Sequence, residues 1–127
     1  MIRSVIRVAF RALIGLFLVL GIPGVAQENA SSGKGAVVRG LDKVNGQIVD
    51  VELFSGATAA VFGLDVSLAD CRYPADNPTG DAFAFLTIRE NGAADIRFEG
   101  WMIASAPALS ALDHSRYDVW VLRCITS

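Results

Sequence analysis

The chain has 127 residues, which is the length of one domain, and 53% of them are hydrophobic against 19% charged. Intrinsic disorder requires low hydrophobicity with high net charge, so this composition excludes a disordered chain. A formal net charge of −2 argues against a nucleic-acid binder, which carries a basic footprint. One His and two Cys exclude a zinc site built from Cys and His alone. The sequence indicates no metal and no cofactor.

Residues 1–26 have the pattern of a signal peptide. Arginines at positions 3, 7 and 11 are the only charges before Glu28, and an apolar run at 12–22 follows them. Small residues, Gly24 and Ala26, precede the expected cut after Ala26. The alternative is an uncleaved inner-membrane anchor, but a spanning helix needs about 20 apolar residues and this run is shorter. We therefore expect cleavage, a periplasmic location and no direct membrane insertion afterwards.

Cleavage changes the charge of the chain. It removes three of the 11 basic residues and none of the 13 acidic ones, which leaves residues 27–127 with a net charge of −5. An acidic domain is repelled by anionic lipid headgroups. The mature chain is therefore not expected to bind a bare membrane surface or nucleic acid.

The two cysteines, Cys71 and Cys124, both lie in the expected mature chain. Export would place them where disulfides persist, and two cysteines allow one intramolecular bridge. That bridge would close a loop of about 54 residues and contribute about 4 kcal/mol in the chain-entropy treatment. Thiol redox chemistry is the alternative, but the C-x-x-C pair that favours it is absent from the sequence. A structural disulfide is predicted.

The mature chain divides into a leader and one β domain. Small and polar residues at 27–35 predict a flexible leader, and residues 36–127 read as a single domain. In that domain, short segments alternate apolar and polar residues, with turn residues such as Asn45-Gly46 between them. The expected strands are 36–41, 47–54, 59–62, 64–69, 82–89, 95–102 and 117–123. This spacing predicts an all-β fold, a small antiparallel β-sandwich or barrel of about seven strands.

Two connections between these strands have a distinct composition. Cys71 is expected to end a strand, and residues 72–81 to form a loop because Pro, Gly and acidic residues are frequent there. The one helical segment expected is a turn or two at 107–113. Ser105 is its candidate cap, and Pro107 suits an early helical position.

Residues 100–120 stand out because their first half has no charge and is rich in Ala and Ser. One interpretation is a tight corner whose large side chains plug one end of the fold. The other is a recognition surface, because Trp, Tyr and Arg dominate interface hot spots. We expect both tryptophans to be largely core, and Arg116, His114 and Tyr117 to form the rim that meets a partner. The candidate partner surface comprises Trp101, His114, Arg116, Tyr117 and Trp120.

Asp113, His114 and Ser115 are the residue types of a catalytic triad, but they are consecutive. A triad needs side chains that converge from separate parts of the fold, and neighbouring side chains point apart. The G-x-S-x-G motif of hydrolases is also absent from the sequence. No catalytic residue is assigned, and the chain is not expected to be an enzyme. His114 is expected to be a turn residue or a partner of Asp113 or Asp118.

Three blocks of the chain resemble a known family, the secreted bacterial family catalogued as domain of unknown function 2155. The opening block is 36–46, the central block is 100–102 with 105–112, and the closing block is 117–122 with Cys124. The resemblance covers nearly the whole mature domain. It implies an exported alphaproteobacterial protein with a Cys pair, and it implies no activity.

These features together predict an exported periplasmic binding or scaffold module that acts through a protein–protein surface. Its partner is expected to be a protein of the cell envelope, whose identity the sequence does not reveal. The alternative is an accessory subunit or assembly factor on the periplasmic face of an inner-membrane complex, such as a respiratory one. That alternative follows from the resemblance, and no residue points to it.

Overall fold

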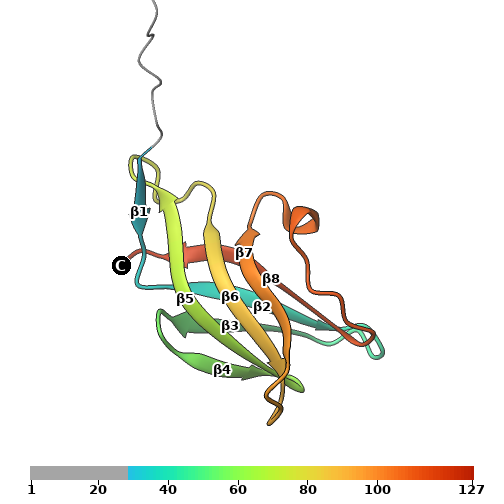
Figure 1. Ribbon diagram of the computed structural model, residues 1–127. Helices are drawn as coiled ribbons and strands as arrows, with labels where there is room; N and C mark the ends of the chain where they lie inside the picture. The colour runs from blue at the N-terminus through green and yellow to red at the C-terminus, as the bar shows by residue number, and fades with distance from the viewer. Residues whose placement is uncertain (1–28) are drawn as a thin grey trace, which may run out of the picture.

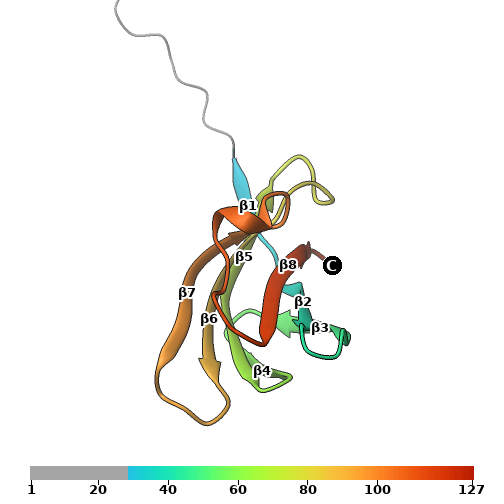
Figure 2. The same ribbon diagram turned by 90° about the vertical axis from the view of Figure 1, so that its right-hand side faces the viewer.

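The computed structural model describes residues 29–127 as two antiparallel β-sheets packed face to face (Figure 1). The expected signal peptide, residues 1–26, lies outside the described residues. Figure 2 shows the two sheets as separate layers, with the loop that carries η1 (Pro107–Leu109) crossing from one to the other. The predicted all-β sandwich is confirmed. The barrel alternative is wrong, because each sheet keeps its own edge strands and the two do not close on each other.

The larger sheet has five strands and the smaller has three. In the larger sheet, β5 pairs with β6 along one edge and with both β4 and β1 along the other, and β7 forms the far edge beyond β6. In the smaller sheet, β2 lies between β3 and β8. The strand bounds are β1 (Ala30–Ser32), β2 (Gly35–Asp42), β3 (Ile48–Phe54), β4 (Thr58–Val61), β5 (Leu64–Pro74), β6 (Phe83–Glu90), β7 (Ile96–Ile103) and β8 (Tyr117–Ile125).

The seven expected strands correspond to β2 through β8, and β1 is additional. The expected flexible leader, residues 27–35, is wrong from residue 30 onward, because residues 30–32 pair with β5. The segment is held further by backbone hydrogen bonds: Gly33 N–H donates to Cys71 C=O and Lys34 N–H to Ile125 C=O, each at 2.7 Å. Backbone pairing with a free strand edge needs no apolar side chains, so composition did not reveal this strand.

Two β-bulges direct both cysteine side chains toward the core. In β5, Leu68 faces the core, and the pairing register then skips one residue before Cys71. In β8, Val121 faces the core, and the register skips one residue before Cys124. Each extra residue reverses the direction of the side chains that follow it. The two sulfurs therefore meet between the sheets, where the disulfide joins β5 to β8 with the Cα atoms 5.7 Å apart, and the predicted bridge is confirmed.

Two details of the connections differ from expectation. β5 does not end at Cys71 but continues to Pro74, because β1 pairs with it there, so the loop begins later than predicted. The helical segment is the single 3-10 turn η1, and Ser105 does not cap it. Instead, the Ser105 hydroxyl donates to Asp81 Oδ2 at 2.6 Å and its N–H donates to Oδ1 at 3.0 Å. These bonds tie the η1 loop to the segment that precedes β6.

The tight turns follow their residue types, with one exception. Gly46 has φ +75°, and Asn45 Oδ1 accepts the Gln47 N–H at 2.9 Å, as an Asn-Gly turn predicts. Phe62, between β4 and β5, has φ +53° although it carries a large side chain. Its ring stacks on Tyr117 with centroids 5.7 Å apart, and this contact offsets the backbone strain.

The core lies between the two sheets. Alternate residues of β5 and β6 meet alternate residues of β2 and β8, and β7 adds one more side chain. Neither tryptophan belongs to this core. Its largest fully buried side chains include Leu53, Leu64, Leu68, Leu86, Ile88 and Met102.

Candidate functional site

The five residues of the candidate partner surface do not form one surface. Trp101 lies on the outer face of the five-stranded sheet, and Trp120 lies on the outer face of the three-stranded sheet. His114, Arg116 and Tyr117 lie together where β8 begins. The outer faces of a sandwich point away from each other. Residues that are close in the sequence are therefore placed in three separate environments.

Trp101 is 42% exposed, so the expectation that it is largely core is wrong. Met102 points into the core from β7, and its two neighbours therefore point outward. Directly opposite in β6, Phe85 pairs with Trp101 and Phe83 pairs with Ile103. The rings of Phe85 and Trp101 meet edge to face, with centroids 5.4 Å apart. We call these four outward side chains, Phe83, Phe85, Trp101 and Ile103, the outer aromatic block.

Polar residues of β5 border the outer aromatic block on one side, and the unpaired edge of β7 borders it on the other. Asp70 and Arg72 of β5 lie in the pairing positions next to its two phenylalanines. Along the strands, the next pair is Thr87 and Glu99, whose side chains are hydrogen-bonded at 3.0 Å. β7 itself has no strand beyond it in the described sheet. An apolar centre with a polar border is the usual anatomy of a protein interface.

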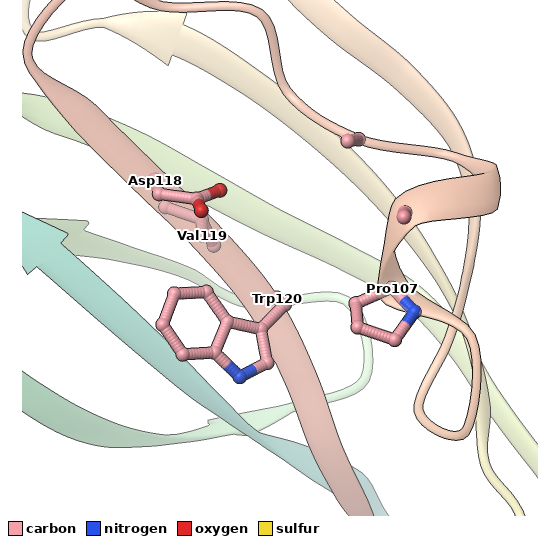
Figure 3. A pocket seen from close by; sticks show the side chains of 6 residues that line it. Pro107, Asp118, Val119 and Trp120 are labelled. Carbon is pink, nitrogen blue, oxygen red and sulfur yellow. The ribbon is translucent and has the colours of Figure 1, made fainter.

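Trp120 is partly buried, but it does not belong to the core between the sheets, so the expectation that it is largely core is also wrong. Val119 and Val121 take the inward positions of β8, which leaves Trp120 facing outward beside η1. An open pocket of about 420 Å³ lies here, and Figure 3 shows the Trp120 indole, the Asp118 carboxylate and the Pro107 ring around it. We call it the Trp120 pocket; it is lined by Pro107, Ala108, Ala111, Asp118, Val119 and Trp120.

His114 is buried rather than at a rim, and its ring joins β6 to the start of β8. Its Nδ1 accepts the backbone N–H groups of Arg116 and Tyr117 at 3.0 and 3.1 Å. Since Nδ1 is an acceptor, the ring proton is on Nε2, which donates to Glu90 Oε1 at 2.6 Å. The expected aspartate partners are therefore wrong, and Glu90 takes their place.

Arg116 is half-exposed, but its guanidinium is held by the buried carboxylate of Asp42. Its Nε and Nη2 donate to Oδ2 at 3.2 and 3.0 Å. These hydrogen bonds lower the pKa of Asp42 below its usual value; burial opposes the change, and the N–H groups of Val44 and Asn45 add to it. The guanidinium also lies 5.3 Å from the ring centroid of Tyr117. Arg116 thus anchors the β2–β3 turn to the start of β8.

Tyr117 supports the fold from inside rather than forming a rim. Its ring contacts two others: Phe62, stacked with centroids 5.7 Å apart, and His114, with centroids 5.1 Å apart. A side chain at Gly63 would approach the Tyr117 hydroxyl to 3.0 Å, so the ring fills the space that this glycine leaves. Of the three residues where β8 begins, Arg116 therefore offers the most surface to a partner.

Acid should weaken the contact between Asp42 and Arg116. A carboxylate with a lowered folded-state pKa stabilises the fold above its unfolded pKa, about 3.9, and this stabilisation is lost as pH falls through the folded pKa. Arg116→Gln should therefore lower the melting temperature at neutral pH, and the difference from the native protein should shrink below about pH 4. Thermal unfolding followed by circular dichroism at both pH values measures this.

The control for the acid prediction is Lys34→Gln, which removes an exposed positive charge. Within residues 29–127, Lys34 makes no ion pair. Its difference from the native protein should be small and similar at both pH values. An Arg116→Gln difference that does not change with pH would contradict the assigned role of the Asp42 carboxylate.

Five residues that complete these surroundings were not predicted from the sequence. Phe83, Phe85 and Ile103 lie beside Trp101 on the outer face of the five-stranded sheet. Glu90 and Asp42 hold His114 and Arg116 at the start of β8. One signal was present: residues 82–88 are apolar at almost every position rather than at alternate ones. In an antiparallel strand, this pattern indicates that both faces are covered or that one apolar face is exposed. The Glu90 and Asp42 contacts left no such signal, because they join distant parts of the chain.

The fold and its surfaces define a small disulfide-linked β-sandwich with an apolar block exposed on one outer face. Comparison with family models matches residues 36–124 to the family described as uncharacterized protein conserved in bacteria (DUF2155). The chain belongs to this family, and the resemblance seen in the sequence is confirmed. Comparisons with curated proteins and with solved structures found no match.

Within residues 29–127, no helix is long and apolar enough to cross a membrane. In the same part of the chain, no group of three or more His, Cys, Asp or Glu side chains is placed to hold a metal ion. The features that remain as candidates are the two outward-facing tryptophans and their surroundings.

Proposed function

We propose that this protein is an exported binding or scaffold module of the bacterial cell envelope, with no catalytic activity of its own. The outer aromatic block carries the proposal. Trp101 is 42% exposed and lies outside the core, so folding does not account for a tryptophan at this position. Exposed aromatic side chains with a polar border are the groups from which interface hot spots are built.

The location in the periplasm is supported by the disulfide. Cys71 and Cys124 are bonded between the two sheets, and such bonds persist in oxidising compartments such as the periplasm. The arginine-rich start followed by a short apolar run agrees with export. The net charge of −5 for residues 27–127 disfavours binding to anionic lipid and so supports a protein as the partner.

The outer aromatic block has the size of an interface centre rather than of a whole interface. A stable interface buries about 800 Å² on each partner, whereas single aromatic side chains bury about 150–250 Å². Parts of the four side chains are already covered by their neighbours. A partner must therefore also contact the polar border on β5 and the free edge of β7.

Trp101→Ala should strongly weaken partner binding while the domain stays folded. The ring is half-exposed, so its loss should cost less than about 2 kcal/mol of stability, mainly from the contact with Phe85. Loss of a hot-spot tryptophan should weaken partner binding by more than about tenfold. The measurement is affinity capture of the tagged protein from detergent-solubilised envelopes, paired with urea unfolding of each variant.

The matched control is Ile48→Ala, because Ile48 is 59% exposed but lies on the outer face of the other sheet. It should retain the partner that Trp101→Ala loses. Capture of one stoichiometric membrane complex through Trp101 would define the module as an accessory subunit or assembly factor. Equal capture by both variants, or no stoichiometric partner with the native protein, would contradict the proposal.

A further inference from the structure

We infer that the Trp120 pocket binds an arginine side chain presented by a partner protein. The inference rests on the proposed function for the source of that arginine. The pocket itself is on the outer face of the three-stranded sheet and shares no residue with the outer aromatic block. It is therefore a second recognition site with its own chemistry.

The two groups that recognise a cation lie side by side on one strand. Asp118 and Trp120 are two residues apart on β8, so they share a face at a spacing of about 7 Å. Figure 3 shows the carboxylate of Asp118 beside the indole of Trp120. An indole face attracts a cation within about 6 Å of its centroid, and a carboxylate accepts hydrogen bonds from the same cation. A guanidinium that stacks on the Trp120 indole can also donate hydrogen bonds to the Asp118 carboxylate.

The chain's own cations do not occupy this site. Within residues 29–127, Asp118 forms no ion pair. Arg39 is opposite Trp120 in the pairing of β2 with β8, but its guanidinium is directed to β3. There, its Nε and Nη2 donate to the two carboxylate oxygens of Asp50 at 2.7 and 2.9 Å. The negative charge of the Trp120 pocket is therefore available to a partner.

The remaining walls of the Trp120 pocket select the kind of cation. Pro107, Ala108 and Ala111 offer apolar surface without hydrogen-bonding side chains, and Asp118 is the only charged residue of the lining. An anion would be repelled by this carboxylate, because the lining has no basic side chain to bind it. A purely apolar ligand would leave the carboxylate without a hydrogen-bond partner. The aliphatic stem of an arginine can lie along the Pro and Ala wall, while its flat head stacks on the ring.

The charge of the whole domain agrees with a basic partner. Residues 27–127 carry a net charge of −5, and complementary charge speeds encounter with a positive surface and disfavours negative ones. Arginine is preferred to lysine because its planar guanidinium stacks on aromatic rings and donates in a fork.

The test uses a short peptide, acetyl-Gly-Arg-Gly-amide, and its neutral counterpart with citrulline in place of arginine. The two indole N–H signals of the ¹⁵N-labelled periplasmic protein are followed by NMR, and Trp101→Phe assigns them. The arginine peptide should shift the Trp120 signal saturably, and the citrulline peptide should not. Asp118→Asn should weaken binding about fivefold to tenfold. Asp113→Asn removes a nearby exposed carboxylate outside the lining and should change nothing.

Three results would overturn the inference: an equal response to both peptides, unchanged binding by Asp118→Asn, or no movement of the Trp120 signal as the arginine peptide is added to its solubility limit. The peptide titration needs no captured partner. Its failure would leave the Trp101 results intact, and failure of partner capture at Trp101 would leave the titration intact. The two proposals can therefore fail separately.

Discussion

Cys71→Ser should lower the free energy of unfolding by about 2–5 kcal/mol. The bridge joins positions separated by 53 residues, so its loss frees a long loop in the unfolded chain. It also connects the two sheets through side chains that are 0% and 8% exposed, and the serine hydroxyl would be buried in their place. A domain of this size has a total stability of only about 5–15 kcal/mol, so the loss is a large fraction.

Urea unfolding of the oxidised native protein, the reduced native protein and Cys71→Ser measures this loss. The double variant Cys71→Ala/Cys124→Ala separates the effect of the bond from that of a buried hydroxyl, because it removes both sulfurs and adds no polar group. It should match the reduced protein more closely than Cys71→Ser does. Rapid alkylation of the native protein without denaturant, or equal midpoints for the oxidised and reduced forms, would refute a structural role for the bridge.

His114→Ala should be the second strongly destabilising change. The imidazole satisfies two backbone donors at the start of β8 and one carboxylate oxygen of Glu90. Each buried polar group left without a partner costs about 1–3 kcal/mol. Glu90 also lies 3.7 Å from the Arg97 guanidinium, so its carboxylate keeps this contact when the imidazole is removed. Most of the cost should therefore come from the two backbone N–H groups.

His114→Asn is the matched variant for this test. The Asn side-chain oxygen can take the position of Nδ1 and accept the backbone donors, but the side chain is too short to reach Glu90. Urea unfolding should therefore rank the native protein above Asn and Asn above Ala. Ser115→Ala, at the exposed neighbouring position, should stay within about 0.5 kcal/mol of native. Equal losses for Asn and Ala would show that the Nδ1 hydrogen bonds do not carry the effect.

The strands and the disulfide could be predicted from the sequence, because both depend on local patterns or on simple counting. Residues 47–54 alternate with a period of two, Asn45-Gly46 specifies a tight turn, and two cysteines have one possible intramolecular pairing. These features do not depend on which strand pairs with which. The all-β class followed from them, while sandwich and barrel both stayed open; the family resemblance rested separately on the three blocks that begin at residues 36, 100 and 117.

The directions of the two tryptophans could not be predicted in this way. In β7, the residues at 100–103 are apolar or small at every position, so either face could have been the inner one. The direction of each side chain is set by the pairing register and by bulges, and both depend on strands far away in the sequence. Trp101 therefore faces outward because the neighbouring Met102 fills the core.

The sequence by itself determined that this protein is an acidic, all-β domain with one cystine and a signal-like start. Only the tertiary structure decided which side chains are available to a partner. It brought Asp42 to Arg116, Glu90 to His114 and Phe62 to Tyr117, which made all three expected rim residues supports of the fold. It also separated Trp101 from Trp120, because their strands belong to different sheets. The physical reason is that the alternation of side chains along a strand is local, whereas the packing of the whole domain decides what each face of the strand contacts.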